Sequence, residues 1–111
     1  MVTMTVIAQV KPQKQQEFLQ AVSSLYGGGE EEKEKGLKKT TLYQEVNAPT
    51  GFRLVAEWDT QKDLERYVRA ENFRVLLGAL EVLCKESEIR YSELPEKGDR
   101  NSGTTFLIEG A

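Results

Sequence analysis

TLYQEVNAPTGFRLVAEWDTQKDLERYV, residues 41–68, decides the fold, because two strand patterns, a turn and the start of a helix follow one another within it. Apolar and polar residues alternate through 40–46 and again through 52–58, which is the period of a strand with one buried face. The intervening NAPTG, residues 47–51, has the composition of a short hairpin turn. Thr60 then fits a helix N-cap, with an acidic residue three positions later. This stretch predicts a β-hairpin that leads directly into a helix.

The flanking sequence supplies the remaining elements. Residues 2–10 alternate as a strand, and Pro12 fits the first turn of the helix that follows it. Asn72 is predicted to cap a second helical segment after the one that begins near Thr60. Residues 88–94 are predicted to form the last strand. The first helix is expected to bury one stripe spaced at three and four residues: Phe18, Ala21, Val22 and Leu25.

The order strand, helix, strand, strand, helix, strand predicts an α+β fold of the ferredoxin-like βαββαβ type. In that arrangement a four-stranded antiparallel sheet has its first and third strands in the middle and both helices on one face. At 111 residues the chain is expected to form one domain, residues 1–94. Residues 95–111 are expected to be a partly flexible C-terminal tail. Within it, residues 104–108 could add an edge strand to this chain or to another one.

The side of the sheet that faces the helices is expected to carry alternate apolar residues of the first and third strands. A row of this kind, covered by amphipathic helices, forms the core of such a domain. The predicted members are Val2, Met4, Val6, Ala8, Leu54, Ala56 and Trp58.

The opposite side of the sheet is expected to be half apolar, which is unusual for a surface exposed to water. Apolar patches of several hundred square ångströms normally mark a contact with a partner. We therefore expect a homodimer in which two copies pack sheet against sheet; the alternative is a monomer whose C-terminal tail covers this side. The predicted residues are Ile7, Tyr43, Val55, Ile89 and Tyr91 beside Thr5, Glu45, Arg53, Glu57 and Glu93.

The net charge of −3 argues against a nucleic-acid partner, because phosphate binding needs clustered lysine and arginine. It argues equally against an anionic membrane surface, and no apolar run is long enough to span a bilayer. The single cysteine, Cys84, excludes an intramolecular disulfide and fits a reducing, cytoplasmic environment. Cys84 is expected to be a buried apolar residue near the end of a helix, with a reactive thiol as the alternative.

The chain contains no histidine, which limits the chemistry that it can perform. Catalytic triads and cysteine–histidine pairs are excluded, and zinc, iron or copper sites normally need histidine or cysteine ligands. The glycine- and glutamate-rich segment 27–36 lacks the spaced ligands of a calcium loop and the lysine of a phosphate loop. It is expected to be a solvated loop, with a partner-binding loop as the alternative. The prediction is a protein without a metal ion or an organic cofactor.

Three stretches together resemble the antibiotic biosynthesis monooxygenase (ABM)-like domain of the dimeric α/β barrel superfamily. They are VTMTVIAQVKPQKQQEFLQAV at residues 2–22, the quoted block 41–68, and ENFRVLLGALEVL at residues 71–83. Glu57-Trp58, followed by a capped helix and then Phe73-Arg74-x-Leu76-Leu77, is the most specific combination. The resemblance covers residues 2–94.

The resemblance implies a dimer with a pocket between sheet and helices. Members of the family include cofactor-independent oxygenases of phenolic polycyclic substrates, quinol oxidases and haem-degrading enzymes, and others have no assigned activity. The haem-degrading branch of the family uses a helix histidine and a first-strand asparagine. Leu77 and Val6 lie near the corresponding positions of this sequence. We therefore expect no haem degradation. Tyr67 and Leu77 occupy positions at which many members of the family carry histidine.

Without a cofactor, oxygen can react with an electron-rich phenolate if the site removes the phenol proton or stabilises the anion. The candidate pocket residues are Trp58 for stacking, Tyr67 and Asn72 for hydrogen bonds to a phenol, and Arg69 and Arg90 for anion stabilisation. For each of them a structural role is the alternative: core packing, a helix cap or a solvated face.

The first functional hypothesis is a cofactor-independent monooxygenase-like enzyme that acts on a small aromatic or quinol substrate. The second is a non-enzymatic dimeric module that binds a small apolar ligand. The third is a domain that makes protein–protein contacts through the acidic segment or the tail. The first two need an open pocket lined by Trp58 and polar groups, whereas the third predicts a filled core at that place.

Overall fold

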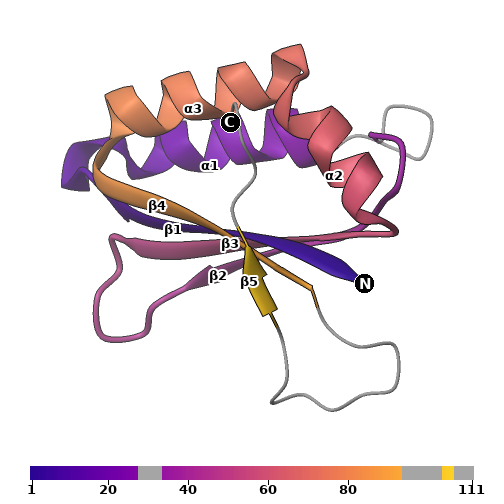
Figure 1. The fold of residues 1–111 in the computed structure, drawn as a ribbon. Helices are drawn as coiled ribbons and strands as arrows, with labels where there is room; N and C mark the ends of the chain where they lie inside the picture. Colours follow the sequence, from indigo (N-terminus) through magenta and orange to yellow (C-terminus); the bar gives the residue numbers. More distant parts are fainter. Residues whose placement is uncertain (28–33, 94–103, 107–111) are drawn as a thin grey trace.

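The computed structural model describes residues 1–27, 34–93 and 104–106, and these form one antiparallel sheet covered on one face by helices (Figure 1). Part of the predicted acidic loop, residues 28–33, and most of the predicted tail, residues 94–103 and 107–111, lie outside this description. The elements in chain order are β1 (Val2–Val10), a 3₁₀ turn (Pro12–Lys14), α1 (Gln15–Tyr26), β2 (Leu37–Gln44), β3 (Gly51–Trp58), α2 (Gln61–Val68), α3 (Glu71–Leu83), β4 (Cys84–Glu93) and β5 (Thr104–Phe106).

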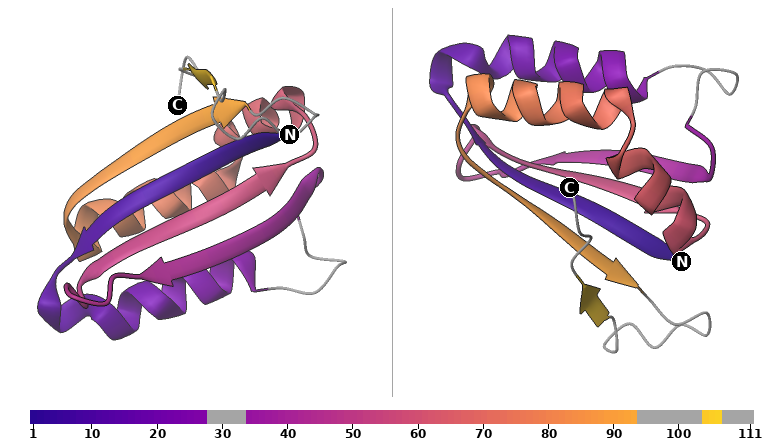
Figure 2. Two further views of the ribbon diagram at one scale, coloured as in Figure 1. Left: turned by 90° about the horizontal axis from the view of Figure 1, so that it is seen from below. Right: turned by 45° about the horizontal axis from the view of Figure 1, so that its top comes forward.

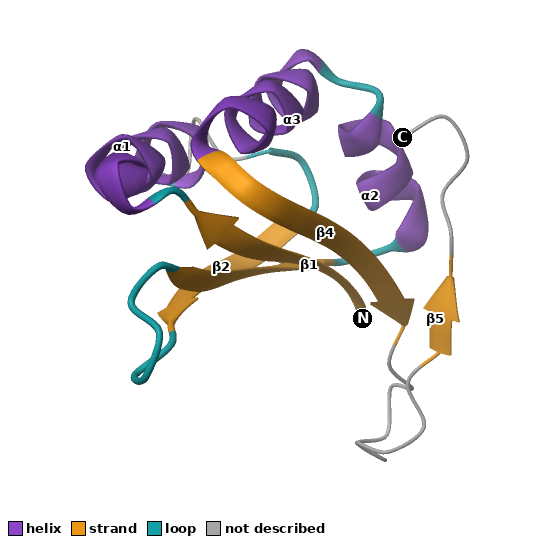
Figure 3. Cartoon of the chain, turned by 90° about the vertical axis from the view of Figure 1, so that its left-hand side faces the viewer, coloured by secondary structure: helices purple, strands orange, loops and turns teal. Residues whose placement is uncertain are grey.

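The strand order β2-β3-β1-β4 confirms the predicted ferredoxin-like α+β fold, with β1 and β3 in the middle of four antiparallel strands. The short strand β5 extends the sheet at the β4 edge, where Phe106 pairs with Tyr91. α1, α2 and α3 all lie on the same face, and the views in Figures 2 and 3 show the other face without a helix. Among the described residues, no helix is long and apolar enough to cross a membrane.

The core lies between the sheet and the helices, as the alternation in β1 predicts. Every second residue of β1 is buried, while the residues between them are half-buried. The register pairs Met4 with Ala56 and Val2 with Trp58, so their side chains share the face that the helices cover. The core residues predicted for this face are all buried: Val2, Met4, Val6, Ala8, Leu54, Ala56 and Trp58.

The predicted cap of α2 is confirmed, and the predicted cap of α3 is wrong. The backbone N–H of Asp63 donates to the side-chain oxygen of Thr60 at 3.1 Å, which satisfies one free donor of the first turn. The N-cap of α3 is Ala70, which makes no side-chain cap. Asn72 lies one position inside the helix, and its amide instead donates to the Glu34 carboxylate at 2.7 Å.

α3 passes directly into β4 without a connecting loop. Leu83 is the last helical residue and Cys84 the first strand residue. Lys11 holds this junction, because its backbone N–H donates to the Leu83 carbonyl at 2.9 Å and its ammonium donates to the Val82 carbonyl at 3.0 Å. Cys84 is buried as predicted, and this burial raises the pKa of its thiol.

The predicted side of β4 is corrected by the register. Tyr91 pairs with Met4 and Ile89 pairs with Val6, so both lie on the helix-covered face and not on the open one. Glu93 pairs with Val2 and belongs to the same side. The reason is an irregularity in the ladder between Gln9 and Val10, which shifts the register by one residue. Alternation in the sequence therefore did not give the orientation of this strand.

The open face combines half-buried apolar residues of the central strands with charged residues of both the central strand β3 and the outer strands. Ile7 and Val55 are half-buried there, and Tyr43 is 55% exposed. Their neighbours on this face, from the registers of β1, β2, β3 and β4, include Thr5, Gln9, Lys39, Thr41, Arg53, Glu57, Glu88 and Arg90.

Candidate functional site

An aromatic cluster occupies the end of the core where β3 stops and α2 begins. Trp58 is the last residue of β3 and is 0% exposed. Its ring centroid lies 4.8 Å from that of Tyr67 on α2, and Tyr67 in turn lies 5.6 Å from Phe73 on α3 in an edge-to-face arrangement. Tyr26, the last residue of α1, completes the cluster at 6.4 Å from Tyr67. Such contacts stabilise a core beyond their buried area.

Two phenol groups meet inside this cluster. The hydroxyl oxygens of Tyr26 and Tyr67 are 2.6 Å apart, which is a short hydrogen bond. Burial, opposed in part by this hydrogen bond, raises the pKa of Tyr67 to about 12. Burial and the same neighbour raise the pKa of Tyr26 further. Both phenols are therefore neutral near pH 7; within the pair one hydroxyl donates to the other, and neither phenol acts as a base.

Trp58 contributes a buried donor whose partner is missing among the described residues. Its indole nitrogen Nε1 is the one fully buried side-chain nitrogen or oxygen there without a hydrogen bond. A buried donor left unpaired costs about 1–3 kcal/mol. Native proteins keep few such groups, and each one calls for an explanation, such as a bound water molecule or a functional role.

A groove of about 170 Å³ opens beside the cluster, between the end of α1 and the helix-covered side of β2 and β3. Tyr26 belongs to both the cluster and the groove, so its ring connects the buried phenol pair to solvent. Trp58 does not line this groove, which differs from the pocket predicted from the sequence. The groove is lined by Val22, Ser23, Tyr26, Gly27, Thr40, Leu42 and Leu54.

The predicted pocket residues divide into two that meet and three that do not join them. Trp58 and Tyr67 are in ring contact in the core. Asn72 is exposed and bonded to Glu34, and Arg69 is exposed at the end of α2. Arg90 lies across the sheet, where its guanidinium contacts the Glu88 carboxylate at 2.8 Å.

Neither Tyr26, which lines the groove, nor Glu34, the partner of Asn72, was predicted from the sequence. Tyr26 continues the α1 stripe at four residues after Val22, so the helical spacing could have found it. Glu34 stands in a run of charged residues, and nothing in the sequence separates it from its neighbours. Its position became evident through the hydrogen bond to Asn72.

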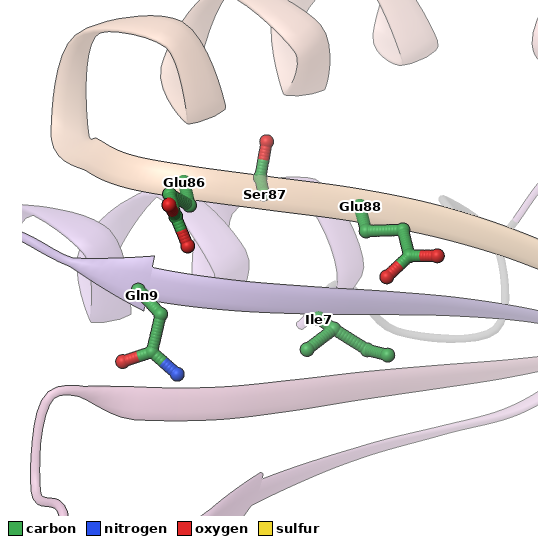
Figure 4. Close-up of a pocket in the computed structure, with 5 residues that line it drawn as sticks. All are labelled: Ile7, Gln9, Glu86, Ser87 and Glu88. Carbon is green, nitrogen blue, oxygen red and sulfur yellow. The ribbon is translucent and has the colours of Figure 1, made fainter.

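The open face carries a second hollow, of about 570 Å³, above β1 and β4. Figure 4 shows Glu86 and Glu88 on the same side of β4 and Ser87 on the other side, which faces the helices. Ile7 and Gln9 of β1 complete its lining. Within the described part of the chain, no three histidine, cysteine or acidic residues gather in a way that could hold a metal ion.

Comparison with known proteins gives the family. Residues 1–77 match the family model "Antibiotic biosynthesis monooxygenase". A conserved protein from Methanosarcina mazei Go1 is 31% identical, with 81% of this chain and 88% of that chain aligned and a TM-score of 0.71.

Two more distant structures share the fold. A protein from Nitrosomonas europaea named after the same family is 20% identical, covers 85% of this chain and 98% of its own, and has a TM-score of 0.71. One from Deinococcus radiodurans is 12% identical, covers 89% and 97%, and has a TM-score of 0.75. No curated protein matches the chain. The match over residues 1–77, with the fold and the M. mazei relative, shows that this chain belongs to the antibiotic biosynthesis monooxygenase family.

Proposed function

We propose that this protein binds a single-ring quinol in the groove beside Tyr26 and promotes its reaction with molecular oxygen without a metal or an organic cofactor. The observation that carries the proposal is the Tyr26–Tyr67 hydroxyl pair, 2.6 Å apart, with Tyr26 lining an open groove. The family to which the chain belongs is named for monooxygenation, which supports the reaction type. Fold and family alone do not fix an activity, so the site must carry the argument.

The size of the groove favours one aromatic ring. Its volume is about 170 Å³, and an apolar cavity of roughly 150 Å³ is known to hold benzene. Valine and leucine side chains line it together with the hydroxyl groups of Ser23 and Thr40. A lining of this kind accepts an apolar ring and orients its polar substituents.

The phenol pair supplies a polarised donor for such a ligand. If Tyr67 donates to the Tyr26 oxygen, the Tyr26 proton is free to bind a ligand oxygen, and the first hydrogen bond strengthens the second. A donor placed in this way stabilises negative charge that develops on the ligand oxygen. The quinol itself supplies the electrons, because quinol plus oxygen gives hydroxyquinone plus water without another reductant.

A non-enzymatic ligand-binding module is the second candidate. It is favoured by the raised pKa values of Tyr26 and Tyr67, because neither phenol can serve as a base at neutral pH. In this case the groove binds the same single-ring ligands, and thermal stability rises with ligand concentration while oxygen consumption stays at the rate of the buffer.

Tyr26→Phe tests both candidates. It removes one hydroxyl from the pair and keeps the ring, so affinity for hydroquinone is expected to fall about tenfold, the value of one hydrogen bond of about 1.4 kcal/mol. If the protein is an enzyme, kcat/KM measured by oxygen uptake falls at least as far.

The matched control is Tyr43→Phe, which removes a phenol hydroxyl from an exposed residue of the open face. It is expected to leave affinity and oxygen uptake unchanged. Equal loss in both variants, or no loss in either of them, would show that the phenol pair does not hold the ligand.

We further propose that two copies associate through the open sheet face. Ile7 and Val55 lie at its centre on neighbouring strands β1 and β3, with the exposed Arg53 of β3 directly beside Ile7 and further charged residues on β2 and β4. A two-fold axis through this centre would bring the apolar side chains of both copies together and leave the charges of β2 and β4 at the rim.

Ile7→Glu is expected to convert this dimer to a monomer, because it places a carboxylate in the centre of the buried contact. Analytical ultracentrifugation over a range of protein concentrations measures the change. Val46→Glu is the control, since Val46 is 95% exposed in the hairpin turn and its substitution should leave the mass unchanged. A wild-type protein that sediments as a single copy at high micromolar concentration would refute the association.

A further inference from the structure

One end of the groove beside Tyr26 lies where α1 ends and β2 begins. The Tyr67 ring packs against Tyr26, the last residue of α1, and against Trp58, the last residue of β3. Trp58 in turn pairs with Leu37, the first residue of β2. The last turn of α1 and the first residues of β2 are therefore at the same end of the groove.

The opposite ends of α1 and β2 also lie together. Phe18 belongs to the first half of α1, and its ring centroid lies 5.0 Å from that of Phe52. Phe52 pairs with Gln44, the last residue of β2. The helix and the strand therefore run in opposite directions along the groove, and this fixes the order of the lining residues from one end to the other.

The end of the groove at Tyr26 carries hydroxyl groups. On β2, Thr40 lies nearer to this end, and Leu42 follows about 6.7 Å further along the strand on the same face. Ser23 adds a hydroxyl whose Oγ is turned towards this end, because it would lie 3.2 Å from a β-carbon added at Gly27. Thr40 is half-buried and Ser23 is exposed, so water competes less for the Thr40 hydroxyl.

The other end of the groove is aliphatic. Val22 lies one helical turn before Tyr26, and Leu42 pairs with Leu54 on the same side of the sheet. Val22 and Leu54 are buried, and Leu42 is half-buried. A ligand hydroxyl placed among these side chains would lose water without gaining a hydrogen-bond partner, which is unfavourable.

We propose that Thr40 is a specificity-determining residue that makes the groove select quinols with two adjacent hydroxyl groups, such as catechol, over hydroquinone. The proposal rests on the proposed function and narrows its substrate class. One ligand hydroxyl meets Tyr26, and the adjacent one meets Thr40, whose hydroxyl can donate or accept. In hydroquinone the second hydroxyl is on the opposite side of the ring and points to the aliphatic end, where it stays unpaired.

The binding of phenol, catechol and hydroquinone to the full chain tests this proposal. Titration calorimetry is carried out without oxygen, so that the ligands are not oxidised during the measurement. Catechol should bind about tenfold more tightly than phenol, the factor that one well-placed hydrogen bond adds, and hydroquinone should bind no more tightly than phenol. Thr40→Val keeps the branched shape and removes the hydroxyl. In this variant the affinity for catechol should fall to that for phenol, and the affinity for phenol should stay unchanged.

Thr41→Val is the matched control. Thr41 is the next residue of β2, is half-buried like Thr40, and pairs with Val55 on the open face. This variant should keep the wild-type ratio of catechol to phenol affinity, and a loss of the ratio here would contradict the assignment to Thr40. If the wild type binds the ligands without preferring catechol, or if Thr40→Val keeps the preference, the inference is wrong and the proposed ligand site stands. If the wild type binds none of the three ligands, the ligand site itself fails.

Discussion

Trp58→Ala is expected to lower the free energy of unfolding by about 3–5 kcal/mol, the usual cost of removing a large aromatic side chain from a packed core. Trp58 is 0% exposed and in ring contact with Tyr67, so its loss leaves a space that helices and sheet cannot easily close. Urea denaturation at one fixed protein concentration measures the change, because association with a second copy would make stability depend on concentration.

Trp58→Phe distinguishes the stability contribution of the aromatic ring from that of the indole N–H group. Phenylalanine keeps most of the ring contact and removes a buried donor that is unpaired among the described residues. The two effects have opposite signs, so the net loss is expected to stay below about 1.5 kcal/mol. A loss as large as that of Trp58→Ala would show that the indole nitrogen makes a stabilising hydrogen bond in solution.

The second large effect is expected at Gly36. Its φ angle is 84°, and a β-carbon added there would overlap with the carboxyl group of Asp63. Gly36→Ala therefore combines an unfavourable backbone conformation with a steric clash, and we expect a loss of about 1–3 kcal/mol. Thermal unfolding followed by circular dichroism measures it.

Gly78→Ala provides the opposite case within the same chain. Gly78 lies inside α3, and nothing stands within 4 Å of a β-carbon added there, so no close packing requires a glycine at this position. Alanine should stabilise the helix by about 0.5–1 kcal/mol. If both glycine substitutions changed stability in the same direction, the local geometry of one of the two sites would be wrong.

Much of the fold followed from patterns that depend on one strand or one helix at a time. The alternation through β1 predicted its bounds and its buried side, and Thr60 marked the start of α2. β4 was harder, because its buried residues Cys84 and Tyr91 are separated by an odd number of positions. Only the ladder to β1, with its shift near Gln9, determines which side each residue takes.

The candidate site was predicted in part for the same reason. Trp58 and Tyr67 were predicted to line the same pocket between sheet and helices, and their rings are in contact there. Arg90 was placed with them because the predicted side of β4 was wrong. Glu34 depends on a contact between residues 38 positions apart, and no local pattern reports a contact of that kind.

The direct joint between Leu83 and Cys84 limits how this protein can vary. One extra residue there would turn every side chain of β4 over, so that Arg90 would enter the apolar interior and Tyr91 would leave it. The hairpin between β2 and β3 has loop residues that can accommodate an insertion, whereas no loop residue separates α3 from β4. Insertions and deletions within the family are therefore expected in the β2–β3 hairpin loop and not at the joint between α3 and β4.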